Sequence, residues 1–297
     1  MRAYLTGGSG FVGAWLQQHL ADAGDSVVAP GPELDVLDPS SLEADVRDSA
    51  PEVVYHLAAL THVGRSWEDP VATFQVNAVG TLNLLEAASR CPDPPTVVLI
   101  SSAEVYGPAP DGTPLTEEAE LRPFTPYAVS KVAAEYLGVQ AHLGRHLRVV
   151  RARPFNHVGP GQSDDFVVSA LARRMVEAEA QGGGTVPVGN LGASRDFTDV
   201  RDVVRAYRLL ALHGTAGDVY NVCSGSAITI ASLADQMAST LDVEIKLEPD
   251  PELFRPVDVP VLLGDATHLV AVTGWKPEIP LETTLRDVLD HWRQTNA

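Results

Sequence analysis

The chain has 297 residues, enough for one large α/β unit with a smaller appended lobe, and 45% of its residues are apolar, which predicts a globular protein. It carries 21 Lys and Arg against 39 Asp and Glu, a formal charge of -18, which argues against binding to nucleic acid or to an anionic membrane because phosphate contacts need clustered cations. Any anionic ligand must therefore find local arginines.

Cys91 and Cys223 are the only cysteines, and neither lies in a CxxC or a metal-ligand spacing, which suits a reducing cytoplasm. The sequence runs from Met1 into a short apolar segment and then into glycines, without the apolar region of a signal peptide, and no apolar run approaches bilayer length. We therefore expect a cytoplasmic protein that binds neither nucleic acid nor membrane.

Residues 2–6 are expected to form a buried strand, followed by a glycine-rich turn and an apolar-periodic helix that runs through Leu20. Glycines are needed where the backbone bends sharply and approaches a pyrophosphate, whose charge lies against the amides of the helix N-terminus. Two registers fit, Gly8-x-Gly10-x-x-Gly13 and Gly7-x-x-Gly10-x-x-Gly13. Directly after an N-terminal strand, such a turn predicts dinucleotide binding.

The second strand is expected at residues 25–29, where an acidic residue would bind the 2′-hydroxyl of the adenosine ribose or a basic one a 2′-phosphate. Neither type stands at Ala29-Pro30-Gly31. No Lys or Arg occurs between Arg2 and Arg47, which favours NAD slightly, although residues elsewhere could hold a 2′-phosphate.

A third buried strand, at residues 52–57, ends in small residues that let a cofactor lie close, Ala58 and Ala59. His56 and His62 flank this point, but no carboxylate or second imidazole stands at metal spacing. We therefore interpret both histidines as structural and expect no metal. A long helix is expected at residues 70–90.

A nearly all-apolar run at residues 96–101 predicts a central parallel strand covered on both faces, and Ser102 follows at its C-terminal end. Ligands of doubly wound sheets bind at those ends, so Ser102 is placed where chemistry happens, with Glu104 and Tyr106 just beyond. The alternative for Ser102 is a plain hydrogen bond at the end of a strand.

Tyr127 and Lys131 lie four residues apart at the expected start of a helix, with Pro126 at its first position and Thr125 as the cap. Both side chains then share one helix face, and the cation and the positive helix end favour the phenolate, which predicts a lowered pKa for the tyrosine. Such a tyrosine can exchange a proton near neutral pH. The spacing alone also suits an ordinary amphipathic helix.

After a strand at residues 147–153 the character of the sequence changes, and a helix from Asp165 to about Ala180 is followed by short strands that flank Gly189-Asn190. Residues 219–223 are expected to return to the main sheet. We therefore expect an α/β fold in which a Rossmann doubly wound parallel sheet (1–155 with 194–224) carries a smaller α/β C-terminal substrate-binding lobe (156–193 with 225–297).

The glycine turn, the strand-end serine and the Tyr-x-x-x-Lys pair, in this order, resemble the extended short-chain dehydrogenase/reductase family that acts on nucleotide sugars, also called the NAD-dependent epimerase/dehydratase family. The resemblance covers essentially the whole chain. In the second half, RPFNHVGPGQ, SRDFTDVRDVVRAY, VYNVCSG and RPVDVPVLLGD are similar to the GDP-mannose branch, which comprises GDP-mannose 4,6-dehydratases and GDP-4-dehydro-6-deoxy-D-mannose reductases.

The resemblance implies that a reduced nicotinamide, from NAD or NADP, delivers hydride to a sugar ketone. Tyr127 would supply the proton, Ser102 would hydrogen-bond the same oxygen, and Lys131 would lower the tyrosine pKa and hold the nicotinamide ribose. Glu104 is a fourth candidate catalytic residue. The implied cofactor contacts are Gly7, Gly10, Phe11, Val12, Gly13, Asp35, Val36, Leu57, Ala58, Ala59, Asn77, Ser101, Tyr127, Lys131 and Pro154.

The resemblance also implies a GDP-sugar substrate, whose diphosphate and ribose are held at the family positions that match Asn156, Asn190, Arg195 and Arg255. For Arg195 and Arg255 the alternative is a surface ion pair. The full set of implied substrate contacts is Ser66, Ser102, Tyr127, Asn156, Val168, Asn190, Arg195 and Arg255.

The two activities of the branch share the Ser/Tyr/Lys set. A dehydratase needs an additional base, which Glu104 could be, whereas Ala103 has no proton to give where many dehydratases carry a hydroxyl or carboxyl group. The region after the second strand also lacks the arginine-rich loop of the dehydratases. We therefore favour a reductase that gives GDP-D-rhamnose, with the 4,6-dehydratase and other nucleotide-sugar epimerases or reductases as alternatives.

A non-catalytic dinucleotide sensor or scaffold on the same fold is a further alternative, but it has no need for Ser102, Tyr127 and Lys131 together.

The helices expected at residues 70–90 and 126–143 resemble those that pair into a four-helix bundle in this family. The resemblance therefore implies a homodimer.

Overall fold

The computed structural model describes residues 1–108, 112–254 and 259–295, and its centre is a parallel sheet with the strand order β2-β1-β3-β4-β5-β9. The order runs outward in both directions from β1, as in a doubly wound fold, which confirms the predicted class. The six strands are β1 (Arg2–Thr6), β2 (Ser26–Val28), β3 (Val53–His56), β4 (Thr96–Ile100), β5 (Val149–Pro154) and β9 (Val219–Val222).

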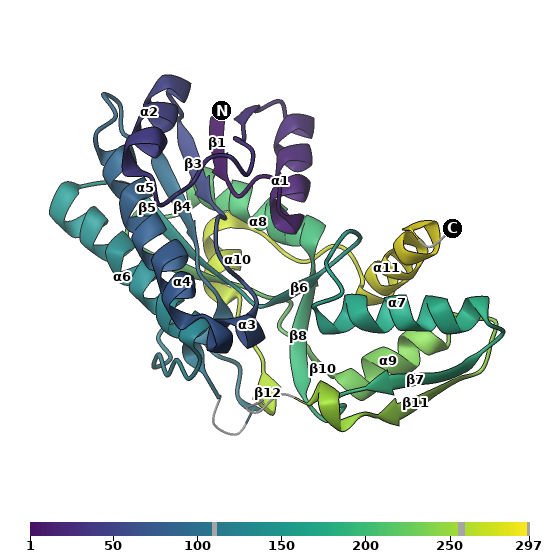
Figure 1. Cartoon of the computed structure of the whole chain (residues 1–297). Helices are drawn as coiled ribbons and strands as arrows, with labels where there is room; N and C mark the ends of the chain where they lie inside the picture. The colour runs from purple at the N-terminus through teal and green to yellow at the C-terminus, as the bar shows by residue number, and fades with distance from the viewer. Residues whose placement is uncertain (109–111, 255–258, 296–297) are drawn as a thin grey trace.

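Helices cover both faces of this sheet (Figure 1). On one face lie α2 (Pro39–Ser49), α5 (Gly80–Ser89) and α6 (Pro126–Arg145), and on the other α1 (Phe11–Asp22), α8 (Val200–His213) and α10 (Thr267–Thr273). Because every residue of β3 and nearly every residue of β4 is buried, both faces of the central strands are apolar, which is why their sequences show no alternation.

The long helix expected at residues 70–90 is present as α4 (Pro70–Phe74), a π-helical turn (Gln75–Val79) and α5. The π turn carries Asn77, whose Nδ2 donates to Leu60 O at 3.0 Å and to Ser130 Oγ at 2.9 Å. A short helix before it, α3 (Val63–Glu68), has no periodic signal in the sequence and was not predicted.

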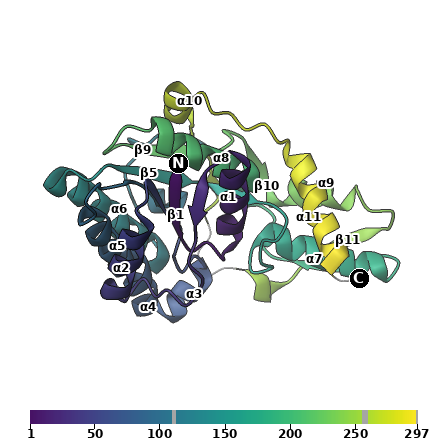
Figure 2. The same ribbon diagram turned by 90° about the horizontal axis from the view of Figure 1, so that it is seen from above.

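A second lobe lies beside the first (Figure 2). Its four-stranded sheet contains β6 (Asn156–Val158), β8 (Ser194–Asp199), β10 (Ala227–Thr229) and β12 (Val261–Leu262), and its two-stranded sheet contains β7 (Gly184–Val188) and β11 (Ile245–Pro249). Its helices are α7 (Val167–Ala180), α9 (Ile230–Ala238) and α11 (Leu281–Thr295). Two 3-10 helices complete the described chain, η2 (Ala103–Tyr106) after β4 and η4 (Pro251–Leu253) after β11.

Two segments belong to the other lobe than the one expected from the sequence. Strand β8, assigned to the Rossmann unit, pairs with β6, β10 and β12, and its Phe197 packs in the core of the second lobe. Conversely, Leu269 and Trp275, assigned to the second lobe, are fully buried in the core between the parallel sheet and α8. The two corrections have one cause, because a strand or helix belongs to whichever apolar surface it buries.

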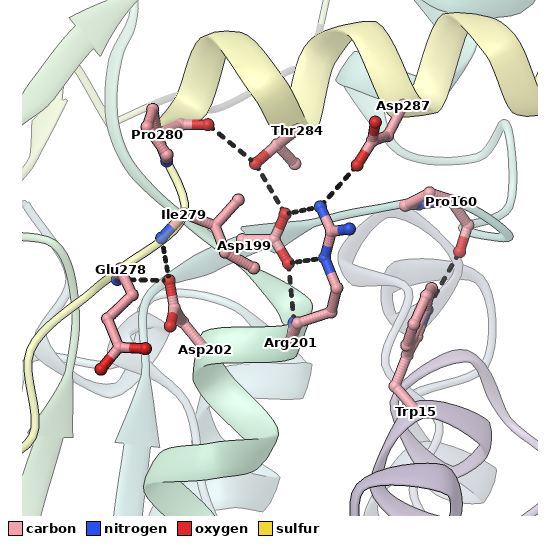
Figure 3. A network of polar contacts seen from close by, with 10 residues as sticks. All are labelled: Trp15, Pro160, Asp199, Arg201, Asp202, Glu278, Ile279, Pro280, Thr284 and Asp287. Atoms are coloured by element: carbon pink, nitrogen blue, oxygen red, sulfur yellow. Dashed lines mark hydrogen bonds and ion pairs between the residues drawn. The ribbon is translucent and has the colours of Figure 1, made fainter.

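A polar network joins α8 of the first lobe to α11 of the second (Figure 3). The buried Asp199 carboxylate accepts from Thr284 Oγ1 at 2.6 Å and from Arg201 Nη2 at 2.7 Å, and it also caps α8. Arg201 in turn donates to Asp287 of α11 at 2.7 Å. A buried carboxylate is stable only when hydrogen bonds and an opposite charge compensate it, as they do at Asp199.

The same network reaches the helix that follows the glycine turn. The Arg201 guanidinium lies 5.9 Å from the ring centroid of Trp15, and Trp15 Nε1 donates to Pro160 O at 3.1 Å. One turn along α8, Asp202 Oδ2 accepts from the backbone N–H groups of Glu278 and Ile279 (Figure 3). The segment before α11 and the loop after β6 are therefore both fixed to the Rossmann unit.

We predict that Asp199→Ala lowers the free energy of unfolding by about 3 kcal/mol, because it leaves Arg201 and Thr284 without their shared acceptor and removes the cap of α8. Urea unfolding followed by circular dichroism measures the change. Asp287→Ala is the matched control, since Asp287 is one-third exposed and its loss should cost less than about 1 kcal/mol. Equal effects of the two substitutions would contradict the role assigned to Asp199.

Candidate active site

The glycine turn between β1 and α1 leaves no room for side chains at Gly7 and Gly13. Gly7 has a φ of 71°, and a Cβ there would lie 2.7 Å from Ala58 N, whereas a Cβ on Gly13 would lie 2.3 Å from Gly7 O. Gly10 is the N-cap residue of α1 and has no side chain, so no side-chain cap accepts from the first amides of the helix. These residues fit a dinucleotide, whose pyrophosphate such amides bind, and they favour the register that starts at Gly7.

Other predicted cofactor residues line the same end of the sheet. Phe11 stacks on His157, with ring centroids 6.4 Å apart, and Val12 packs partly buried beside it. Leu57, Ala58 and Ala59 follow β3 and are half-buried, whereas Pro154 ends β5 and is buried. Asp35 Oδ1 accepts from Leu37 N, and Val36 packs against Gly80 of α5. The contacts of these residues with a cofactor stay predictions.

Three consecutive residues at the end of β4 are hydrogen-bonded to three residues of α6. Ile100 O accepts from Lys131 Nζ at 2.9 Å, the Ser101 side chain donates to Glu135, and the Ser102 and Tyr127 side chains are hydrogen-bonded. The Thr125 hydroxyl caps α6 by accepting from Ala128 N, as predicted. The side chains of Ser102, Tyr127 and Lys131 therefore meet at one point of the structure.

The expected lowering of the Tyr127 pKa is wrong. Burial raises the pKa of this phenol well above its usual range, the hydrogen bond from Ser102 lowers it, and the charge of Glu104 raises it. The helix terminus and the neighbouring ammonium do not outweigh the removal of the phenol from water, because a buried phenolate loses its hydration. Tyr127 thus keeps its proton at neutral pH and is suited to donate it.

Lys131 is 6% exposed, and burial lowers the pKa of its ammonium to about 8, against the charge of Glu135, which raises it. Glu135 lies one helical turn further along α6 and is fully buried. Lys131 also lies close enough to His56 to lower the pKa of that imidazole, although burial is the larger cause and brings the value to about 3. A site with one ammonium near its titration point is sensitive to every buried charge around it.

The Glu135 carboxylate is held by a network that the sequence analysis missed. Arg153 of β5 donates to its two oxygens at 2.8 and 2.7 Å, and Arg153 Nη1 donates to Tyr106 Oη at 2.9 Å. Tyr106 Oη donates to Asn221 Oδ1 of β9 at 2.7 Å. Two signals were available: Glu135 follows Lys131 by four residues, and Arg153 is one of two arginines in a strand that is otherwise apolar.

The hydrogen bonds of three further predicted residues lie within the protein. Ser101 Oγ faces Glu135, the Asn77 amide bonds Leu60 and Ser130, and Ser66 Oγ donates to Val63 O and accepts from Tyr127 N at 3.3 Å. Ser66 and Asn77 thus position the start of α6. Whether they also contact ligands stays a prediction.

The remaining predicted substrate residues lie in or next to the second lobe. Asn156 is in β6, Val168 is buried in α7, and Asn190 Oδ1 accepts from Gly192 N. Arg195 donates to Val259 O and Ser194 O. Arg255 lies outside the described residues.

Among the described residues no group of His, Cys, Asp and Glu could hold a metal, and no helix there is long and apolar enough to cross a membrane.

The chain is similar to known proteins over most of its length. A family model described as GDP-mannose 4,6 dehydratase matches residues 32–288. The chain is 43% identical over 296 residues to GDP-6-deoxy-D-mannose reductase of Pseudomonas aeruginosa, covering 98% of this chain and 97% of the relative. It is 33% identical over 262 residues to GDP-mannose 4,6 dehydratase 2 of Arabidopsis thaliana, covering 86% and 69%.

Two solved structures show the same fold. The structure of RMD from Pseudomonas aeruginosa complexed with NADPH matches with a TM-score of 0.92 at 40% identity, over 99% of this chain and 100% of the other. The Thermus thermophilus UDP-glucose 4-epimerase complex with NAD matches with a TM-score of 0.86 at 31% identity, over 99% of each chain.

We predict that Lys131 titrates near pH 8, and that Glu135→Gln moves its titration to lower pH because it removes the negative charge that raises the pKa of this ammonium. The chain has only two other lysines, Lys246 and Lys276, both exposed, so the 13Cε resonance of Lys131 can be followed in lysine-labelled protein.

Glu248→Gln is the control, because it removes a carboxylate from an exposed position of β11 in the second lobe, and it should leave the titration of Lys131 unchanged. An unchanged Lys131 titration in the folded Glu135→Gln protein would show that this carboxylate has no electrostatic effect on the site.

Proposed function

Because the chain belongs to the GDP-mannose 4,6 dehydratase family, we propose that it is an NAD(P)H-dependent reductase of the C4 ketone of GDP-4-dehydro-6-deoxy-D-mannose. The product is then GDP-D-rhamnose. The observation that carries the proposal is the hydrogen-bonded Ser102–Tyr127 pair next to Lys131 at the end of β4, in a chain that is 43% identical to a GDP-6-deoxy-D-mannose reductase over nearly its full length.

A nicotinamide cofactor held at the glycine turn would supply the hydride for C4. Tyr127 holds its proton at neutral pH and gives it to the C4 oxygen as the negative charge develops there, so that the ketone becomes an alcohol. Ser102 donates a hydrogen bond to the same oxygen, which it can do because it already points at the Tyr127 hydroxyl. The Lys131 ammonium offsets the charge that the phenolate acquires after the transfer.

Glu104 favours a second candidate, the 4,6-dehydratase. Its charge acts on Tyr127, so the carboxylate lies near the reacting groups, where a base for elimination would stand. Ala103, between Ser102 and Glu104, is buried and has no proton to give. Elimination of water needs an acid as well as a base, so the pair Ala103 and Glu104 supports the reductase better.

We predict that the purified protein oxidises NADH or NADPH when it is given the 4-keto-6-deoxy sugar nucleotide, and that it does not convert GDP-mannose with catalytic NAD(P). Absorbance at the nicotinamide band and chromatography of the sugar nucleotides measure the two reactions. Formation of the keto sugar from GDP-mannose without net consumption of cofactor would rule out the reductase.

Tyr127→Phe tests the assigned acid in the same assay, and its rate should fall by roughly 10²–10⁴-fold. Tyr136→Phe is the matched control, because Tyr136 lies on the same helix but is 63% exposed. It should leave the rate unchanged.

We further propose that two copies pair through α4 and α6, which are packed against each other. Val129, Tyr136 and Leu143 are exposed apolar residues at seven-residue spacing on α6, and Val71 and Phe74 are exposed on α4. The α6 spacing places its three side chains on one face of the helix, which supports a four-helix bundle between copies.

The two cysteines, both buried and free, support a reducing, cytoplasmic compartment.

We predict that the protein has about twice the 31.6 kDa chain mass in light scattering, and that Tyr136→Glu lowers this value toward one chain because it puts a charge into the apolar face. Leu212→Glu on α8, a similarly exposed apolar position on another face, is the control and should not change the mass. A monomer at micromolar concentration for the unchanged protein would contradict the pairing.

A further inference from the structure

The end of β2 lies directly against the glycine turn. A Cβ on Gly8 would be 2.7 Å from the Cβ of Ala29, the residue after β2. Strand β2 is the edge strand of the sheet and pairs only with β1. In a doubly wound fold the adenosine ribose of a bound dinucleotide lies over this strand end. The side chains that follow Ala29 therefore set the charge that the ribose meets.

The loop after β2 brings the Glu33 carboxylate to Gly31, two residues beyond Ala29. The N–H of Gly31 donates to Glu33 Oε1 at 3.1 Å, and Leu34 N donates to Gly31 O at 3.2 Å, so the loop is a tight turn. The Glu33 carboxylate folds back over this turn, because a Cβ on Gly31 would lie 2.3 Å from its Oε2. The strand end thus has an acidic group although the residues at 29–31 are uncharged.

The nearest cations along the chain lie at the opposite edge of the sheet. Arg2 begins β1, and Arg47 is in the last turn of α2, which runs back from the C-terminal to the N-terminal edge of the sheet. No Lys or Arg lies between them in the sequence. His19, the basic residue of α1, has a pKa lowered by burial and by two arginines, so it adds no charge at neutral pH.

The arginines that other elements bring to this end of the molecule are paired with carboxylates. Arg65 of α3 forms an ion pair with Asp165 at 3.0 Å, and Arg201, next to Trp15, is held by Asp199 and Asp287 (Figure 3). A 2′-phosphate bound at the end of β2 would therefore meet the Glu33 carboxylate while these two arginines are already paired, whereas a ribose hydroxyl would meet a hydrogen-bond acceptor.

We propose that Glu33 selects NADH over NADPH, by accepting a hydrogen bond from the adenosine ribose and repelling a 2′-phosphate. The inference deepens the proposed function, since it assumes that the chain binds a nicotinamide dinucleotide at the glycine turn. Glu33 is exposed, so its substitution leaves the core of the protein intact.

We predict that NADH binds the purified protein roughly tenfold more tightly than NADPH, as expected for one repulsive charge near the phosphate. Isothermal titration calorimetry with each nucleotide measures both affinities without any turnover. Glu33→Gln should bring the two affinities close together, mainly by strengthening NADPH binding, and Glu33→Arg should make NADPH the tighter ligand. Raising the salt concentration should also reduce the preference of the unchanged protein.

Glu248→Gln is the matched control, because it removes the same charge from an exposed position of β11, at the far side of the second lobe (Figure 1). It should leave the preference unchanged. Equal affinities, or tighter NADPH binding by the unchanged protein, would overturn the role of Glu33 while leaving the proposed reductase standing. Failure to bind either nucleotide would overturn the proposed function and this inference together.

Discussion

The position of α6 along the sheet, relative to the end of β4, is the constraint on which the site depends. Ile100, Ser101 and Ser102 are paired with Lys131, Glu135 and Tyr127, so one strand end and two turns of one helix fix every group of the candidate chemistry. The match is anchored in the interior, where Glu135 and Arg153 form a bidentate ion pair. A shift of α6 along the sheet would break this pair and leave charges buried and uncompensated, which costs several kcal/mol.

Burial decides the chemistry of these groups. It raises the pKa of the Tyr127 phenol and lowers the pKa of the Lys131 ammonium to about 8, so the tyrosine carries a proton while the lysine lies near its titration point. The opposite shifts support the proposed roles of the phenol as the proton donor and of the ammonium as the compensating charge. The buried Glu135 keeps the ammonium charged, and Arg153, Tyr106 and Asn221 satisfy the polar groups around it.

Separate contacts hold the second lobe against the glycine turn. Asp199 and Arg201 bind α11, while Trp15 of the first helix binds the loop after β6 (Figure 3). The proposed reaction depends on this arrangement, because hydride transfer requires a cofactor at the turn and a substrate at the second lobe to be in contact. The motif that carries Asp199 and Arg201 is thus part of the link between lobes.

The sequence by itself determined the features that depend on short stretches of chain: the strand, glycine turn and helix at the N-terminus, the buried strand that ends at Ser102, and the Tyr127–Lys131 spacing behind Thr125 and Pro126. Local geometry requires particular residues at these points, so their pattern is readable. Only the tertiary structure decided the buried partner of Lys131, the raised pKa of Tyr127, and the lobe to which β8 and Trp275 belong. Each of these depends on which distant surfaces exclude water together, and no short stretch of sequence records that.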